Sequence, residues 1–160
     1  MFNLRQIANA LAATDTVRTE IKAMDRLKML RDRGLIPATA GTSPGKTTLY
    51  DRADVAFAVL AFVASESGTG QNAIRVLKDE LHRSGAPERQ EIRSFLADIE
   101  KGEPVFVRFD VARKDFPSFT ARISGINLFE RPLDPHVVQS TVLPLTALVS
   151  PIFRALDEAE

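Results

Sequence analysis

The hydrophobic period of the chain changes near residue 103, and this change limits the fold more than any other feature. Up to that point, apolar residues recur every three or four positions, which is the spacing of amphipathic helices. Beyond it, apolar and polar residues alternate in Val105–Val111 and in Phe119–Ser124, as they do in half-buried strands. A third strand is predicted at Val137–Leu143. We therefore expect an α+β fold, with helices first and a small antiparallel β-rich region after them.

Five helices are predicted before the change in period. Asn3 caps the first, with Gln6 in the position that completes a capping box, and Asp51 caps the third. Gly34 and Gly102 follow the ends of the second and the fifth. The third is apolar nearly all round, which is typical of a core helix. The predicted ranges are Leu4–Ala12, Val17–Arg33, Arg52–Ser65, Gln71–Arg83 and a last one from Pro87 to Gly102.

The charges cancel overall but not locally. The 160 residues include 21 Lys and Arg against 21 Asp and Glu, so the formal net charge is zero. A protein that binds nucleic acid by bulk charge alone is therefore excluded. Residues 1–50, however, hold eight basic against four acidic residues, and most of the basic ones lie between Arg18 and Arg33. This asymmetry indicates a local site for an anionic partner.

The scarce residue types exclude several kinds of chemistry. The chain has no Cys, which excludes disulfides, thiolate catalysis and thiolate zinc sites. His82 and His136 stand far apart without a nucleophile beside them, so we expect no catalytic site, metal site or cofactor. No targeting signal is found, and the most apolar stretch, Val55–Ala64, is too short to span a bilayer. We expect a cytoplasmic protein that is not an enzyme and has no membrane partner.

The N-terminal half has the order of elements of a winged helix-turn-helix. A helix, a turn and a basic helix are followed by a loop rich in Gly and Pro and by the helix that Asp51 caps. On a helical wheel, the cations of the basic helix lie nearly opposite its apolar residues. The second helix of such a motif enters the major groove, and a hairpin wing contacts phosphates.

Residues 1–84 resemble the winged helix-turn-helix of the MerR-type regulators. The similar motifs are Gly34-Leu35-Ile36-Pro37, a loop with Pro44-Gly45, Leu49-Tyr50-Asp51 and the segment Gly70–Leu77. That family binds double-stranded DNA as a homodimer and controls transcription, and the resemblance implies the same for this chain. The expected DNA-binding residues are Arg18, Thr19, Lys22, Arg26, Lys28, Arg33, Ser43, Lys46 and Thr47.

The chain departs from the family pattern in several places, among them the approach to Gly34 and the region after residue 84. The stretch between the first helix and Gly34 is several residues longer, which leaves two registers for the start of the base-reading helix, at Val17 or near Lys22. The long dimerising helix of the family is not evident after residue 84. Instead, residues 85–102 are expected to form a connecting helix.

Other functions are compatible with the same residues. A recombination or phage accessory factor, of the excisionase or packaging type, would use the same DNA-binding face. A protein-interaction adaptor would keep the winged fold, and a basic helix face is often only a solvated surface. Residues 40–47 match a loose phosphate-binding loop, but such a loop follows a buried strand and begins a helix at its Lys. A sequence-specific DNA-binding transcriptional regulator is the interpretation that we favour.

Residues 103–160 match no family pattern. Five phenylalanines fall between positions 106 and 129, which favours a small sheet with an aromatic core. We expect this β-rich region to serve dimerisation, a protein partner or sensing. A short last helix is predicted to begin at Pro151, with Ser150 as its cap.

Overall fold

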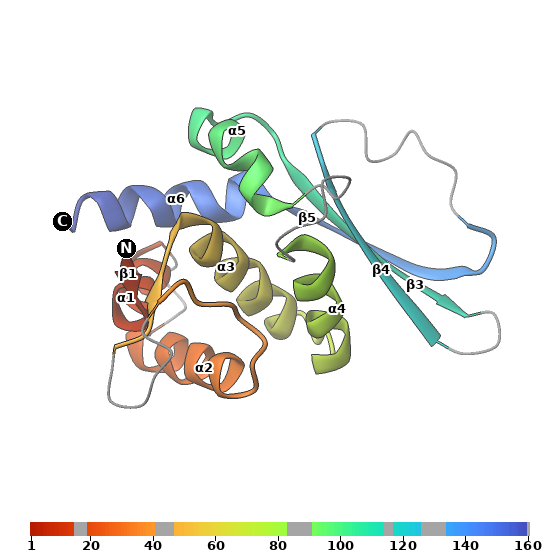
Figure 1. Cartoon of the computed structure of the whole chain (residues 1–160), viewed down its shortest axis with the longest axis horizontal. Coiled ribbons are helices and arrows are strands. Elements are labelled where there is room, and N and C mark those ends of the chain that lie inside the picture. The colour runs from red at the N-terminus through yellow and green to blue at the C-terminus, as the bar shows by residue number, and fades with distance from the viewer. Residues whose placement is uncertain (15–18, 41–46, 83–90, 114–116, 126–133, 160) are drawn as a thin grey trace.

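The computed structural model describes residues 1–14, 19–40, 47–82, 91–113, 117–125 and 134–159. Within them, the chain forms six α-helices and two small antiparallel sheets (Figure 1). The α+β class predicted from the hydrophobic period is confirmed, whereas the winged helix-turn-helix stays a prediction. The helices are α1 (Leu4–Ala13), α2 (Glu20–Asp32), α3 (Arg52–Glu66), α4 (Gln71–Leu81), α5 (Leu96–Lys101) and α6 (Leu145–Asp157).

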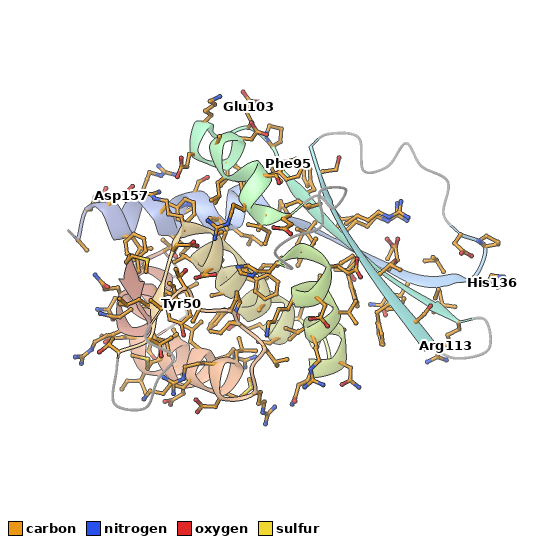
Figure 2. All side chains as sticks on the ribbon, viewed as in Figure 1. Tyr50, Phe95, Glu103, Arg113, His136 and Asp157 are labelled. Carbon is orange, nitrogen blue, oxygen red and sulfur yellow. The ribbon has the colours of Figure 1, made fainter. Side chains whose placement is uncertain are left out.

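The two sheets lie in different parts of the fold. In the first, β1 (Phe2–Asn3) pairs with β2 (Leu49–Tyr50) and so ties the start of the chain to the start of α3. The second has the order β4-β3-β5, from β3 (Phe106–Arg113), β4 (Pro117–Ser124) and β5 (Val137–Pro144). The two strands predicted from the alternation and the third one predicted at Val137–Leu143 are thus confirmed. The end of this sheet that carries Arg113 and His136 extends away from the helices (Figure 2).

The register of the second sheet explains the alternation in the sequence. Val107 of β3 lies opposite Ile123 of β4 and Leu143 of β5. Val107 and Ile123 are buried, and α4 and α6 pack against the sheet. The next apolar residue of β3 on this face, Phe109, is also buried and stacks on Phe119 with ring centroids 5.8 Å apart. The aromatic core that the sequence favours is therefore present at this pair.

Helix α3 is the centre of the core, as its apolar sequence predicts. Every residue from Ala53 to Phe62 is buried, and α3 packs against α2, α4 and α6. Helix α6 also contacts α1 and α5, so the last helix of the chain returns to the first (Figure 1). One continuous cluster of buried residues therefore joins the N-terminal helices, the three-stranded sheet and the C-terminal helix.

The predicted start of the last helix is wrong. Helix α6 begins at Leu145, directly after β5, and Pro151 lies inside it. A proline in this position removes one backbone hydrogen bond, to the carbonyl of Ala147. Leu145 and Val149 are fully buried ahead of the proline. Because their packing stabilises the first turns, the helix continues through Pro151.

The predicted connecting helix up to Gly102 is also shorter than expected. Glu91 has extended backbone angles, a 3₁₀ turn follows at Ile92–Phe95, and α5 begins only at Leu96. The turn contacts α3 and places the Arg93 guanidinium 2.5 Å from the Asp51 carboxylate. Gly102 ends α5 with a φ of +81°, the left-handed conformation that the sequence predicts there. Pro87, the expected first residue, lies outside the described residues.

Candidate nucleic-acid interface

Helices α1 and α2 form a packed pair, and α2 lies at the edge of the molecule (Figure 1). The Thr19 hydroxyl caps α2 by accepting a hydrogen bond from the Lys22 backbone N–H at 3.3 Å. Arg5 of α1 forms an ion pair of 3.6 Å with Glu20 in the first turn of α2. The start of α2 is thus set at Thr19, which lies between the two registers that the sequence leaves open.

One face of α2 packs into the core and the other faces solvent. Ala23, Leu27 and Leu30 are fully buried. Three of the expected DNA-binding cations are exposed, and none of them forms an ion pair with a described residue. They are Lys22, Lys28 and Arg33, the residue that ends the helix. Helix α2 can therefore present positive charge to an anionic polymer without losing its packing.

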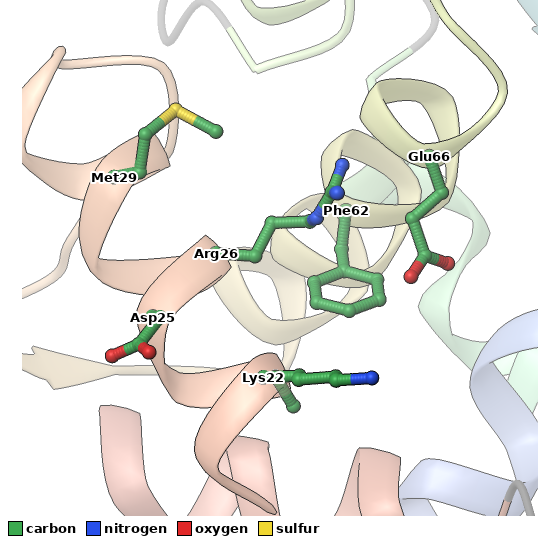
Figure 3. Close-up of a pocket in the computed structure, with 7 residues that line it drawn as sticks. Lys22, Asp25, Arg26, Met29, Phe62 and Glu66 are labelled. Atoms are coloured by element: carbon green, nitrogen blue, oxygen red, sulfur yellow. The ribbon is translucent and has the colours of Figure 1, made fainter. Parts of the chain in front are cut away.

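Arg26 differs from these three cations because it turns toward α3. Its guanidinium donates a hydrogen bond of 3.1 Å to the Ser65 hydroxyl and lies 6.0 Å from the centre of the Phe62 ring. The side chain is half-buried, and Figure 3 shows it crossing from α2 to α3. Arg26 thus joins α2 to α3 in this structure, and a DNA contact would require it to leave Ser65.

An open groove of about 540 Å³ separates the exposed sides of α2 and α3 (Figure 3). Phe62, Met29 and Ala23 supply its apolar wall, and the other four side chains carry charges of both signs. The lining residues are Lys22, Ala23, Asp25, Arg26, Met29, Phe62 and Glu66. The mixed charges give the groove no preference for one sign of ligand.

The segment after α2 returns antiparallel to itself and forms the base of a hairpin. The Leu49 carbonyl accepts hydrogen bonds from the backbone N–H groups of Thr39 and Ala40, and the Leu49 N–H donates to the Ala40 carbonyl at 2.9 Å. Thr47 is exposed at this base. The other expected contacts of this loop, Ser43 and Lys46, lie outside the described residues, as does Arg18.

A buried carboxylate, that of Asp54, joins the hairpin base to the core. The sequence does not predict that this side chain has several partners. The Asp54 side chain is only 2% exposed. It accepts a hydrogen bond from the Thr39 hydroxyl and one of 3.2 Å from the Asp51 backbone N–H. On its other oxygen, the Nε2 atom of His82 lies 2.8 Å away. Asp54 therefore connects the hairpin, the start of α3 and the end of α4.

The neighbouring carboxylate, Asp51, caps α3 and contacts Arg93. Burial raises the pKa of Asp51, but hydrogen bonds from the Asp54 and Ala53 backbone N–H groups and from Arg93 outweigh it and lower the pKa below its usual value. The hydrogen bond with Asp51 likewise raises the pKa of Arg93. Both shifts favour the charged forms, so the pair fastens the 3₁₀ turn to the cap of α3.

Tyr50 pairs with Phe2 in the two-stranded sheet and is completely buried. Its hydroxyl has no hydrogen-bond partner among the described residues, and burial raises its pKa. A buried hydroxyl without a partner costs stability relative to an apolar group of the same shape. Although Tyr50 belongs to the motif that resembles the MerR-type regulators, it cannot contact a ligand in this conformation.

Replacement of Tyr50 with phenylalanine should leave the free energy of unfolding unchanged or raise it by up to about 1 kcal/mol, because the orphaned hydroxyl is removed and the ring stays. Urea unfolding followed by circular dichroism would measure it. Tyr50→Leu, which replaces the ring with a smaller aliphatic side chain, should be clearly less stable than either protein. A loss of more than about 1 kcal/mol in Tyr50→Phe would show that the hydroxyl has a partner after all.

Two further residues of this region, Lys78 and Ile21, were not among those predicted from the sequence. The Lys78 ammonium of α4 donates a hydrogen bond of 2.7 Å to the Gly34 carbonyl and so holds the exit of α2. Ile21, in the first turn of α2, is 73% exposed. A helical wheel places Ile21 on the solvent side of α2, so this residue could have been found from the sequence. Nothing local in the sequence indicates the contact between Lys78 and Gly34.

The part of the chain that the structure describes shows no helix starting at a phosphate-binding lysine, no group of metal ligands and no membrane-spanning helix. The helix after the loose phosphate-binding loop begins at Arg52, six residues beyond Lys46. Among the described residues, no three His, Asp or Glu side chains are grouped so that they could hold a metal ion. No helix in the described part of the chain is both long and apolar enough to cross a membrane.

Comparison with known proteins identifies no relative. No protein-family model, no curated protein and no solved structure matches the chain.

Proposed function

We propose that this protein is a sequence-specific DNA-binding transcriptional regulator that places α2 in the major groove. The observation that carries the proposal is the two-sided character of α2. Ala23, Leu27 and Leu30 fix one face to the core, while Lys22 and Lys28 are exposed on the other face at the edge of the molecule. A helix held in this way can enter a groove as a rigid body.

The surroundings of α2 support the same proposal. The hairpin base at Thr39–Ala40 and Leu49 follows α2 directly, where a wing would contact the phosphates beside the groove. The Leu35 N–H donates a hydrogen bond of 2.8 Å to the Leu30 carbonyl and so closes the turn at the end of α2, four residues before the hairpin base. Five basic residues of the first 50 lie on α2 or at its end: Lys22, Arg26, Lys28, Arg31 and Arg33. We further propose that the protein binds as a homodimer, as the family resemblance implies.

The test is selection of binding sites from random duplex DNA with the full chain, followed by affinity measurements over a range of salt concentrations. Lys22→Ala combined with Lys28→Ala should weaken binding about 10-fold or more and reduce the slope of log affinity against log salt by about 2. Two half-sites spaced by one helical turn in the selected sequence would support the homodimer.

The matched control removes two exposed cations elsewhere, by Lys101→Ala combined with Arg154→Ala. This variant carries the same net charge but keeps the surface of α2, so its affinity and salt slope should stay near those of the parent protein. Equal losses in both double variants would contradict the proposed groove contact. If selection enriches no duplex at all, the protein is not a sequence-specific DNA-binding protein.

A further inference from the structure

Ile21 of α2 is a large apolar residue that is mostly exposed to solvent. At 73% exposure it is more exposed than Val138, at 61%, or Met1, at 55%, the other large hydrophobic residues exposed in the described part of the chain. Its Cα lies in the first turn of α2, just after the residue that Arg5 holds by an ion pair. The position of Ile21 is therefore set by the packed α1 and α2 pair, and its side chain is free.

The position of Ile21 on α2 places it on the row that points directly away from the core. Asp25 and Lys28 follow it at i+4 and i+7, and both are exposed. Ala23 and Leu30, on the opposite side of the helix, are fully buried. If α2 enters the groove, this row faces the base edges, while Lys22 lies to one side of it.

In the major groove, the apolar group that a base pair presents is the 5-methyl group of thymine. A branched aliphatic side chain can bury this methyl group, whereas it has no hydrogen bond to offer the other bases. We infer that Ile21 is a specificity-determining residue that recognises a thymine by contact with its 5-methyl group. This inference rests on the proposed function, which it extends from phosphate contacts to one base.

The test uses uracil in place of thymine, because this change removes the methyl group and nothing else. Each thymine of the selected site is replaced in turn, and the affinity of the full chain is measured. At one position the replacement should weaken binding by roughly 3- to 10-fold, as expected for one buried methyl group. Ile21→Ala should lose a similar factor on the thymine site and should then bind the thymine and uracil sites equally well.

The control variant is Val138→Ala, which shortens another exposed apolar side chain on β5, and it should keep the full response to uracil. The inference is overturned if no replacement by uracil weakens binding of the parent protein. It is also overturned if Ile21→Ala still discriminates thymine from uracil at every position at which the parent protein does. Both results leave the proposed function standing, because the duplex is still bound. Failure to select any duplex overturns the inference together with the proposed function.

Discussion

Replacement of Asp54 with alanine should lower the free energy of unfolding by about 3 kcal/mol, the range expected when a buried charged group with several partners is lost. The carboxylate is 2% exposed and joins the Thr39 hydroxyl, the Asp51 N–H and His82. Alanine would leave Thr39 and His82 without this partner and would remove one half of the capping box of α3. Urea unfolding near pH 7, followed by circular dichroism, measures the loss.

Two control variants separate the contributions to this loss. Asp54→Asn keeps an oxygen that can accept from Thr39 and the Asp51 N–H, so it should cost clearly less than alanine. His82→Ala removes one partner whose side chain is 21% exposed, and it should also cost less. An Asp54→Ala protein that stays within about 1 kcal/mol of its parent would show that the carboxylate does not organise this region.

The features that the sequence predicts well are those set by neighbouring residues. Asn3 and Gln6 form the expected capping box, with hydrogen bonds of 3.0 and 2.9 Å, and Asp51 caps α3. Gly102 has the expected left-handed conformation. Strands β3 and β4 follow the alternation of apolar residues. Each of these features depends on residues within a few positions of one another, so the local sequence is enough to predict it.

The features that the sequence does not predict depend on contacts between distant parts of the chain. In the sequence, Asp54 is only an acid in the first turn of a helix, where the dipole favours it. Two of its partners are distant in the sequence, Thr39 lying 15 residues before it and His82 28 residues after it. Pro151 is likewise a helix start by local rules, and only the burial of Leu145 and Val149 explains why α6 begins earlier.

The candidate interface likewise depends on contacts between helices that the sequence does not predict. A helical wheel gives the direction of each side chain on α2 but not what the side chain meets. Lys22 and Arg26 lie close together on the wheel, yet Lys22 is exposed while Arg26 reaches Ser65 and Phe62 of α3. The pattern of cations does not indicate Ile21 either. Its position opposite the buried face of α2 follows only from the packing of that helix.

Replacement of Phe57 with alanine should cost about 3–5 kcal/mol of unfolding free energy, the range measured for removal of large buried aromatic side chains. The side chain is completely buried near the middle of α3, and its ring meets the His82 ring edge to face at 6.0 Å. Phe57→Leu fills most of the same volume and should cost only about 1–1.5 kcal/mol. Equal losses in the two variants would show that the site collapses around the smaller residue.

The same variant tests whether the chain unfolds as one unit. The buried cluster runs without interruption from α1 through α3 to the three-stranded sheet and α6, so loss of packing at Phe57 should destabilise all of them together. Tyr50 is the only tyrosine and there is no tryptophan, so tyrosine fluorescence reports on the hairpin base while circular dichroism reports on the helices and strands. In Phe57→Ala both signals should shift to lower urea concentration and remain coincident. A part of the circular dichroism signal that keeps the parent midpoint would mean that α3 stabilises only the N-terminal helices, and that residues 103–160 fold on their own.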